Sequence, residues 1–362
     1  MSAPSVAEAT KLNDAFASTR ESFARARRAC GSTETQLTIA DRGVSLVSCP
    51  PRPIRSLARA FGHLRSHRGH APTLTIHVWD SASTKAPPPL LPSDLPGLGA
   101  ATTDGAGAFY YAGGSGLQIG YQPVPDALSM LDSAAGTAWY WTRDFTRLPY
   151  WDCATPLRHL MHWWLREQGL FQVHGAAVGT ASGGVLLVGK GASGKSTSTL
   201  ACLGSKLLFA GDDYVAVEPS QWPWVYSLYG SAKLVPDDIA RFPRLVPELA
   251  NGDRLAEEKA VFYLDGSLAE ATIPGFPLQA ILLPTVTGTA QPRLVEASAA
   301  MALRALAPTT IFQLHPPRAD ALQDMARFVQ SLPAFVLELG PDIAAIPGLI
   351  SRLLDELEGE GV

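Results

Sequence analysis

The residues best suited to chemistry lie in one short stretch, GKGASGKST, at positions 189–197. It matches the pattern GxxxxGK[ST], whose glycines allow backbone N–H groups to converge on a phosphate while the following helix directs its positive end toward it. The lysine supplies a cation for the β- and γ-phosphates, and the serine hydroxyl can coordinate Mg²⁺. The pattern therefore predicts a nucleotide site. Its expected residues are Gly189, Gly191, Ala192, Ser193, Gly194, Lys195, Ser196 and Thr197.

Two adjacent acids, Asp212 and Asp213, end the apolar run KLLFAGDD at 206–213. Asp212 follows Lys195 by 212 − 195 = 17 residues, which is one helix and one turn. We therefore expect the strand over 206–213 to run beside the strand that precedes the loop and to bring both carboxylates to the phosphates. One carboxylate can hold Mg²⁺, and the other can accept a proton from an attacking hydroxyl. The alternative is a turn-forming pair without chemistry.

The pattern of residues around the motif predicts the elements that would position it, and these elements indicate an α/β domain. The apolar run at 185–188 favours a strand before the loop, and 196–204 favours a helix after it. Further strands are expected at 171–179, 213–219, 224–230, 279–286 and 335–341, with an amphipathic helix at 346–359.

The first part of the chain reads as a small α+β unit. Helices are expected at 5–30, 54–67 and 155–169, strands at 35–48, 73–80, 107–114, 116–123 and 136–144, and a proline-rich loop at 81–100. We expect an α+β domain over 1–165 that recognises an acceptor or organises oligomers, and a P-loop domain over 166–362.

Composition excludes several classes of protein. Hydrophobic residues make up 46% of the 362 residues, and the net charge is 29 − 33 = −4, which argues against a nucleic-acid-coating protein. No apolar run reaches the length needed to cross a bilayer, and the N-terminus does not resemble a secretory signal. The four cysteines are widely spaced, which suits reduced thiols. We expect a cytoplasmic protein without nucleic-acid or membrane partners, and homo-oligomer formation is left open.

The run from His174 through HGAAVG, VLLVGKGASGKST and LLFAGDDYVAVE resembles the catalytic core of the HPr kinase/phosphorylase family. The similarity covers roughly residues 171–220. It implies a fold like the nucleotide domain of phosphoenolpyruvate carboxykinase, with ATP and Mg²⁺ as cofactors. It makes Asp212 the general base, Asp213 a magnesium ligand, and His174 a residue that orients the base. From the pattern alone, a lone histidine on an apolar strand is more often a core residue.

The chain also departs from that family. The glycine-rich signature of its phosphorylase activity is missing, and residues 1–165 do not resemble the regulatory domain of the bifunctional enzymes. They are more similar to the divergent kinase homologues that accompany lasso peptides, as is the stretch VYSLYGSAKL at 225–234. That resemblance implies a serine or other hydroxyl on a peptide or small protein as the acceptor.

Other polar residues are weaker candidates. Lys233 and Lys259 each adjoin a strand-like run and could stabilise a transferring phosphoryl group, or could be ordinary surface lysines. Arg318 and Glu218 are weaker still. The cluster His63, His67 and His70 is interpreted as a solvated basic segment rather than a metal site. The tryptophans Trp139, Trp141, Trp163 and Trp164 are expected to pack the junction between the domains.

The sequence thus predicts an ATP- and Mg²⁺-dependent kinase that phosphorylates a hydroxyl of a peptide or small protein. Two alternatives stay open: a kinase of a small-molecule hydroxyl, and a nucleotide-binding sensor or scaffold without catalysis. The pattern does not distinguish ATP from GTP.

Overall fold

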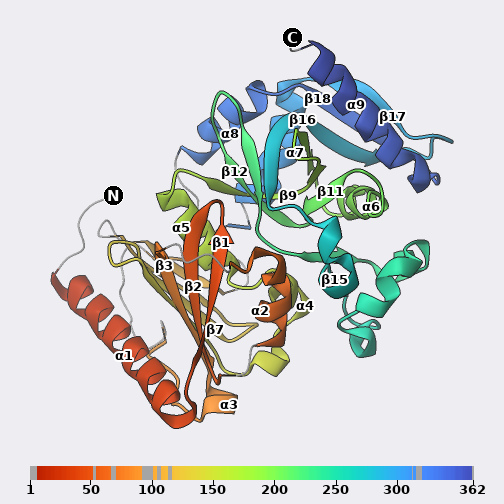
Figure 1. Cartoon of the computed structure of the whole chain (residues 1–362). Helices are drawn as coiled ribbons and strands as arrows, with labels where there is room; N and C mark the ends of the chain where they lie inside the picture. Colours follow the sequence, from red (N-terminus) through yellow and green to blue (C-terminus); the bar gives the residue numbers. More distant parts are fainter. Residues whose placement is uncertain are drawn as a thin grey trace. The chain divides into compact units, whose positions relative to one another are not determined.

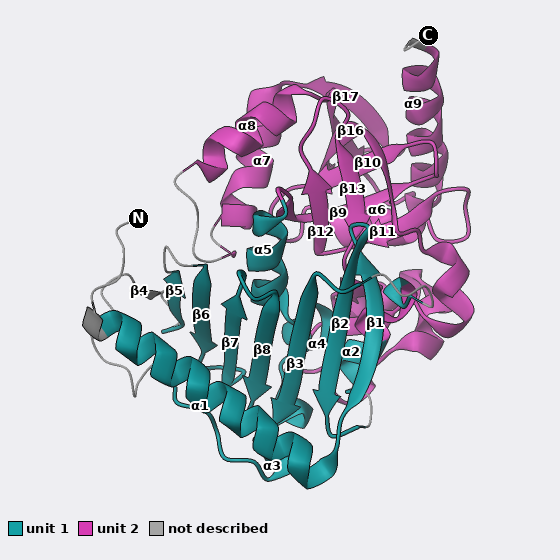
Figure 2. Cartoon of the chain, turned by 60° about the vertical axis from the view of Figure 1, so that its left-hand side comes forward, with its two compact units in different colours: residues 1–58, 64–168 teal, residues 59–63, 169–362 magenta. Residues whose placement is uncertain are grey.

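The computed structural model describes residues 6–51, 54–66, 71–91, 101–103, 107–112, 116–311, 313–314 and 320–360 (Figure 1). The chain divides into two compact units (Figure 2). Unit 1 comprises Met1–Ala58 and Leu64–Gln168, and unit 2 comprises Arg59–His63 and Gly169–Val362. Within the described residues, no helix is both long and apolar enough to cross a membrane.

Unit 1 is built on an eight-stranded sheet in the order β1-β2-β3-β8-β7-β6-β5-β4. Its strands are β1 (Thr33–Ile39), β2 (Arg42–Cys49), β3 (Leu74–Asp80), β4 (Ala101–Thr103), β5 (Phe109–Ala112), β6 (Leu117–Gln122), β7 (Ala127–Asp132) and β8 (Thr137–Thr142). Its helices are α1 (Val6–Cys30), α2 (Arg55–Ala60), which runs into unit 2, α3 (Ser81–Thr84), α4 (Tyr150–Ala154) and α5 (Arg158–Glu167). The pairs β2–β3 and β3–β8 are parallel, and the other neighbours are antiparallel.

The helix α1 covers one face of this sheet, as Figure 2 shows. Trp139 and Trp141 are buried under it, and the ring of Phe16 meets that of Trp139 edge-on at 5.8 Å. Trp163 of α5 is fully buried and packs against Gly120, where a Cβ would meet its ring. These tryptophans therefore fill the core of unit 1 itself. For Trp139 and Trp141 the prediction that they pack a domain junction is wrong, because alternate residues of β8 point toward α1 in the core of unit 1.

Several other predictions for unit 1 differ in detail from the structure. The helix expected at 54–67 is short: α2 is followed by a 3-10 turn at Gly62–Leu64. The strands β4 and β7 and the helix α4 were not predicted. In the expected proline-rich loop, residues 92–100 lie outside the described residues, and α3 occupies its start.

Unit 2 is a mixed α/β unit. Its strands are β9 (Phe171–Gly179), β10 (Gly184–Val188), β11 (Leu208–Gly211), β12 (Tyr214–Glu218), β13 (Trp224–Ser227), β14 (Ser231–Leu234), β15 (Ala260–Tyr263), β16 (Gly275–Val286), β17 (Arg293–Ala297) and β18 (Ala334–Leu339). Its helices are α6 (Lys195–Ala201), α7 (Ala299–Ile311), α8 (Ala321–Gln330) and α9 (Ile346–Glu360). The main sheet has the order β10-β9-β12-β13-β16-β18-β17, and β10 also pairs with β16.

The sheet of unit 2 is covered on both faces. Side chains of α7 and α8 pack with one set of sheet residues, including Val173 and Leu186. Side chains of α9, together with Cys202 directly after α6, pack with the alternate set, including Ala176 and Leu187. Such near-continuous burial is typical of α/β sheets with helices on both faces. The pair β14–β15 forms a separate two-stranded sheet with its own small core.

The strand that leads to the two acids does not run beside the strand that precedes the loop. β11 pairs with β9 at 177–179, and β9 pairs with β10 along its other edge. The sequence prediction on this point is therefore wrong. It assumed that strands joined by one helix are neighbours, but β9 enters the sheet between them by antiparallel pairing.

A short piece of the N-terminal chain belongs to unit 2. The guanidinium of Arg59 forms two hydrogen bonds with the carboxylate of Asp265, at 2.6 and 2.7 Å, and a third with Glu248 at 2.9 Å. The same group lies over the ring of Tyr263, 4.6 Å from its centroid. These contacts anchor the segment Arg59–His63 to unit 2.

Candidate active site

The glycine-rich loop over residues 189–194 joins the end of β10 to the start of α6. Gly194 has φ +105°, and a Cβ there would collide with the side chain of Leu339. Gly189 has φ +153°, and a Cβ would lie 2.8 Å from Oγ of Ser193. Ala192 also adopts a left-handed φ, +61°. The positive φ at both glycines of the motif therefore favours glycine over any residue with a Cβ. By contrast, a Cβ on Gly191 would meet nothing within 4 Å.

The lysine of the motif lies under this loop. Lys195 is 8% exposed, and its Nζ donates to the carbonyl oxygens of Gly189 at 2.7 Å and Lys190 at 3.1 Å. Burial lowers the pKa of Lys195, although the nearby charges of Asp212 and Asp213 oppose that shift. The loop thus holds its own cation at the N-terminus of α6.

The two acids occupy the turn between β11 and β12. Asp213 has a left-handed φ of +78°, which an aspartate tolerates better than most residues. This turn brings β12 alongside the first half of β9, where Tyr214 lies opposite His174. The strained turn therefore places the acid pair next to the histidine of β9.

Asp213 is held between two partners. The Nζ of Lys233 lies 2.6 Å from its Oδ2, and Nε2 of His174 lies 3.3 Å from its Oδ1. Burial alone would raise the pKa of Asp213, but the charge of Lys233 and the hydrogen bond from His174 hold that pKa well below its usual range. Both oxygens of Asp213 are therefore engaged, and its partners favour the ionised carboxylate.

Asp212 has a different environment. Its Oδ2 accepts a hydrogen bond from the backbone N–H of Lys233 at 3.0 Å, and the side chain of Ser196 at the start of α6 acts to lower its pKa. Burial, and then the charge of Asp213, raise the pKa of Asp212. The two neighbouring carboxylates therefore have pKa values displaced in opposite directions, an arrangement common in sites of proton transfer.

The expected partner of His174 was Asp212, but the structure places it against Asp213. The His174 ring also stacks on that of Tyr214, with centroids 5.1 Å apart and planes 27° apart. Its backbone N–H donates to Oγ1 of Thr310 at 3.2 Å, which ties β9 to the end of α7. Tyr214 in turn donates from its hydroxyl to Oε1 of Gln313 at 2.6 Å. Thr310 and Gln313 belong to no motif, so sequence reasoning missed them.

β14 explains the position of Lys233. Ala232 and Leu234 point into the small core of the β14–β15 pair, so the side chain between them must point the other way, toward the acids. Burial opposes the charged form of Lys233, but Asp213 raises its pKa above the usual value. The predicted cation therefore does reach the acid pair.

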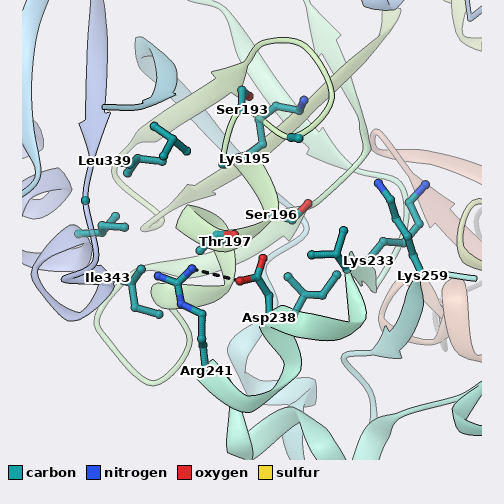
Figure 3. Close-up of a pocket in the computed structure, with 17 residues that line it drawn as sticks. Ser193, Lys195, Ser196, Thr197, Lys233, Asp238, Arg241, Lys259, Leu339 and Ile343 are labelled. Atoms are coloured by element: carbon teal, nitrogen blue, oxygen red, sulfur yellow. Dashed lines mark hydrogen bonds and ion pairs between the residues drawn. The ribbon is translucent and has the colours of Figure 1, made fainter. Parts of the chain in front are cut away.

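A pocket of about 230 Å³ opens in front of α6 and is called the α6 pocket here (Figure 3). Lys233 and Lys259 lie at one end of it and Leu339 and Ile343 at the other, with Ser196 and Thr197 between them. Asp238 and Arg241 form an ion pair at 3.2 Å on its wall. Its lining residues are Ala192, Ser193, Gly194, Lys195, Ser196, Thr197, Lys233, Leu234, Val235, Asp238, Arg241, Lys259, Val286, Leu339, Gly340, Ile343 and Ile346.

A second and larger pocket, about 660 Å³, lies on the α7 side of the same loop and is called the α7 pocket. The two pockets share Ala192, Ser193 and Val286. The α7 pocket is lined by Val188, Gly189, Lys190, Ala192, Ser193, Leu283, Pro284, Thr285, Val286, Met301, Arg304, Ala305, Pro308, Thr309 and Val336. The glycine-rich loop thus lies between a smaller pocket and a larger one.

The remaining candidates are placed as follows. Glu218 accepts a hydrogen bond from the hydroxyl of Tyr226 at 3.0 Å. His63 belongs to unit 2, where its Nε2 lies 2.6 Å from Oγ of Ser227, so the interpretation of His63 as part of a solvated segment is wrong. His67, His70 and Arg318 lie outside the described residues.

The oxygen atoms gathered at the loop suit a magnesium ion. Ser196 offers a hydroxyl, and Asp212 and Asp213 offer carboxylates, which are the hard ligands that Mg²⁺ prefers. Among the described residues, no group of three or more histidine, cysteine or acidic side chains could form an all-protein metal cage. This donor set fits an ion that keeps several waters and shares its ligands with phosphates.

The fold and site define an α/β unit with a glycine-rich loop that faces a buried acid pair. No protein-family model matches the chain, and no curated protein sequence matches it. Among solved structures, it is similar to the HPr(Ser) kinase/phosphatase from Coxiella burnetii, with 10% sequence identity and a TM-score of 0.31. That similarity covers 52% of this chain and 99% of the other. A similarity this low carries no inference about function.

Proposed function

We propose that this protein is an ATP- and Mg²⁺-dependent kinase that transfers the γ-phosphoryl group of ATP to a hydroxyl. The observation that carries the proposal is the position of Lys233, because it lines the α6 pocket together with the loop residues and contacts Asp213 at 2.6 Å and Asp212 at 3.0 Å, which joins the loop motif to the acid pair in one site. Two acids that served only to form a turn would not need to be buried beside the cation of Lys233.

The donor nucleotide occupies the α6 pocket in this proposal. Its phosphates lie against the loop, near Lys195, Lys233 and Lys259, which together offset negative charge as it redistributes in transfer. The apolar end, with Leu339 and Ile343, receives the base. Bound Mg²⁺, held through Ser196 and an acid, would neutralise charge on the β- and γ-phosphates.

The opposite pKa shifts of the two acids support different roles for them, one as a base and the other as a metal ligand. Asp212, whose pKa is raised, accepts the proton of the acceptor hydroxyl. Asp213, whose pKa is lowered, stays ionised and serves as the magnesium carboxylate. His174 and Lys233 position Asp213 through the contacts at 3.3 and 2.6 Å. The effect of Ser196 on the pKa of Asp212 favours a second assignment, in which Asp212 rather than Asp213 is the magnesium carboxylate.

The test is phosphoryl transfer from γ-labelled ATP with Mg²⁺ to peptides and to a metabolite extract, comparing wild type with Asp212→Asn. A base contributes on the order of 10²–10⁴-fold. We expect transfer to fall by that factor while ADP binding stays within a few-fold. If the variant instead loses the Mg²⁺ dependence of its nucleotide affinity, Asp212 is the metal carboxylate.

The same measurement separates a kinase from a nucleotide-binding sensor. A sensor binds ATP, transfers label to nothing, and keeps its biological effect in Asp212→Asn. Tight ATP binding without any labelled acceptor, in wild type and variant alike, would overturn the kinase proposal.

A further inference from the structure

The α7 pocket has no role in the mechanism above, although it adjoins the same loop. The donor side of the loop is the α6 pocket, because Lys195, Ser196 and Thr197 line that pocket and do not line the other. The α7 pocket is reached from Gly189 and Lys190 at the opposite end of the loop. A molecule in the α7 pocket would therefore approach the phosphates from the side that the nucleotide leaves open.

One residue of the pocket wall, Thr309, is next in the chain to a residue that contacts His174. Thr309 lines the pocket, and the next residue, Thr310, accepts the backbone N–H of His174 at 3.2 Å. The ring of His174 touches Asp213 at 3.3 Å. Thr309 of the pocket wall is thus linked to Asp213 through Thr310 and His174.

The lining indicates what kind of molecule fits. Most of the wall is apolar, including Met301, Pro308 and Val336, and the volume of about 660 Å³ is in the range of small-molecule sites. Its charged lining residues are two cations, Lys190 and Arg304, with no acid among them. Within the described residues, no carboxylate forms an ion pair with Arg304 on α7. An exposed, unneutralised guanidinium beside apolar walls favours a carboxylate or phosphate ligand.

We propose that the α7 pocket is the acceptor site and that it takes a small hydroxyl compound carrying its own anionic group, which Arg304 binds. The inference rests on the proposed kinase function. The acceptor oxygen forms a bond to the γ-phosphorus as the bond from that phosphorus to the β–γ bridging oxygen breaks. ADP leaves with that electron pair, and the hydroxyl proton passes to Asp212.

The first arm of the test compares acceptors that differ in the anion. Glycerate and glycerol 3-phosphate are offered with γ-labelled ATP beside uncharged glycerol and a serine-containing peptide. We expect both anions to be phosphorylated at least about 10-fold faster than glycerol at equal concentration. Arg304→Gln should raise the KM for the anion by roughly 10- to 100-fold, which is the loss expected for one charge-assisted hydrogen bond, with the KM for ATP unchanged within about twofold.

Two further variants serve as controls. Arg304→Lys keeps the charge but not the planar fork, so it should recover part of the affinity. Arg352→Gln removes an exposed arginine of α9, outside both pockets, and should change nothing.

The second arm does not depend on transfer. In protein saturated with ADP and Mg²⁺, labelling of Arg304 by phenylglyoxal is followed by mass spectrometry. Glycerate and glycerol 3-phosphate should protect Arg304, and glycerol should not. Protection without transfer to any acceptor would support the site and overturn the kinase proposal.

Other outcomes overturn the inference and leave the kinase standing. Transfer to the serine peptide alone, unaffected by Arg304→Gln, would place the acceptor elsewhere. Weaker ADP binding in Arg304→Gln, or protection of Arg304 by ADP itself, would show that the nucleotide fills the α7 pocket. Absence of protection by either anion would likewise exclude the proposed site.

Discussion

Lys233 meets the acid pair twice: its ammonium lies 2.6 Å from Oδ2 of Asp213, and its backbone N–H donates to Asp212 at 3.0 Å. The side chains of Lys233 and Asp213 are only 14% and 19% exposed. The small β14–β15 sheet is thereby linked to the turn between β11 and β12, so both acids depend on one strand for their position.

Replacing Lys233 with methionine should destabilise the protein and abolish phosphoryl transfer. The change leaves Asp213 as a buried anion with only His174 beside it, and breaking a buried pair from one side costs about 3 kcal/mol or more. The free energy of unfolding in urea measures the first effect. The double variant Lys233→Met with Asp213→Asn should recover much of that stability but no activity. Unchanged stability in the single variant would mean that the pair contributes nothing to the fold.

Replacing Gly194 with alanine should distort the loop. The residue has φ +105°, and its new Cβ would collide with Leu339, so we expect a loss of about 1–3 kcal/mol and of nucleotide binding. Isothermal calorimetry with ADP and thermal unfolding measure the two effects. Gly191→Ala is the matched control, because a Cβ there meets nothing within 4 Å, and it should unfold like wild type. Equal stability of the two variants would contradict this account of the loop.

Replacing Arg59 with alanine should loosen the segment Arg59–His63 from unit 2. The side chain is 20% exposed and binds both Asp265 and Glu248, so removal leaves two carboxylates without their cation. We expect a loss of roughly 1.5–3 kcal/mol in the free energy of unfolding by urea. Arg327→Ala removes a guanidinium that is 68% exposed and should cost less than about 0.5 kcal/mol. An equal effect of the two variants would exclude an anchoring role for Arg59.

The buried imidazole of His63 should make stability depend on pH. Burial lowers its folded-state pKa to about 4, from an ordinary value of 6.5. Between these values the unfolded chain binds the extra proton, so stability falls as the pH falls from about 6.5 to about 4 and then stops changing on this account. The contribution between pH 7 and pH 5 should be about 1–2 kcal/mol.

The measurement for His63 compares unfolding free energies of wild type and His63→Gln at pH 4, 5, 6 and 7. Glutamine can still bond to Ser227 but does not titrate, so the variant should lose part of the acid sensitivity. His77 in unit 1 has its pKa lowered to about 4 as well and should add to the same dependence. Identical pH profiles would show that folding leaves the pKa of His63 at its ordinary value.

The sequence alone determined the local parts of the site. The spacing of glycines, lysine and serine at 189–196 predicted a strand, a turn and a helix because only that conformation brings such residues to one point, and β10 and α6 confirm it. The apolar periodicity likewise predicted α1, α9 and most strands of the α/β unit. These signals depend only on residues that are close together in the chain.

Only the tertiary structure decided which distant residues meet. The family resemblance implied that His174 orients the base, Asp212, and the chain spacing placed the acid strand beside the loop strand. In the structure, β9 lies between those strands and its histidine contacts Asp213. The sequence left open whether Lys233 lies in the site or on the surface. In the structure, the alternation of side chains along β14 directs Lys233 to Asp213. Arg304 and Thr310 carry no motif at all. Strand order and the packing of α7 arise from contacts between segments far apart in the chain, and no local pattern encodes them.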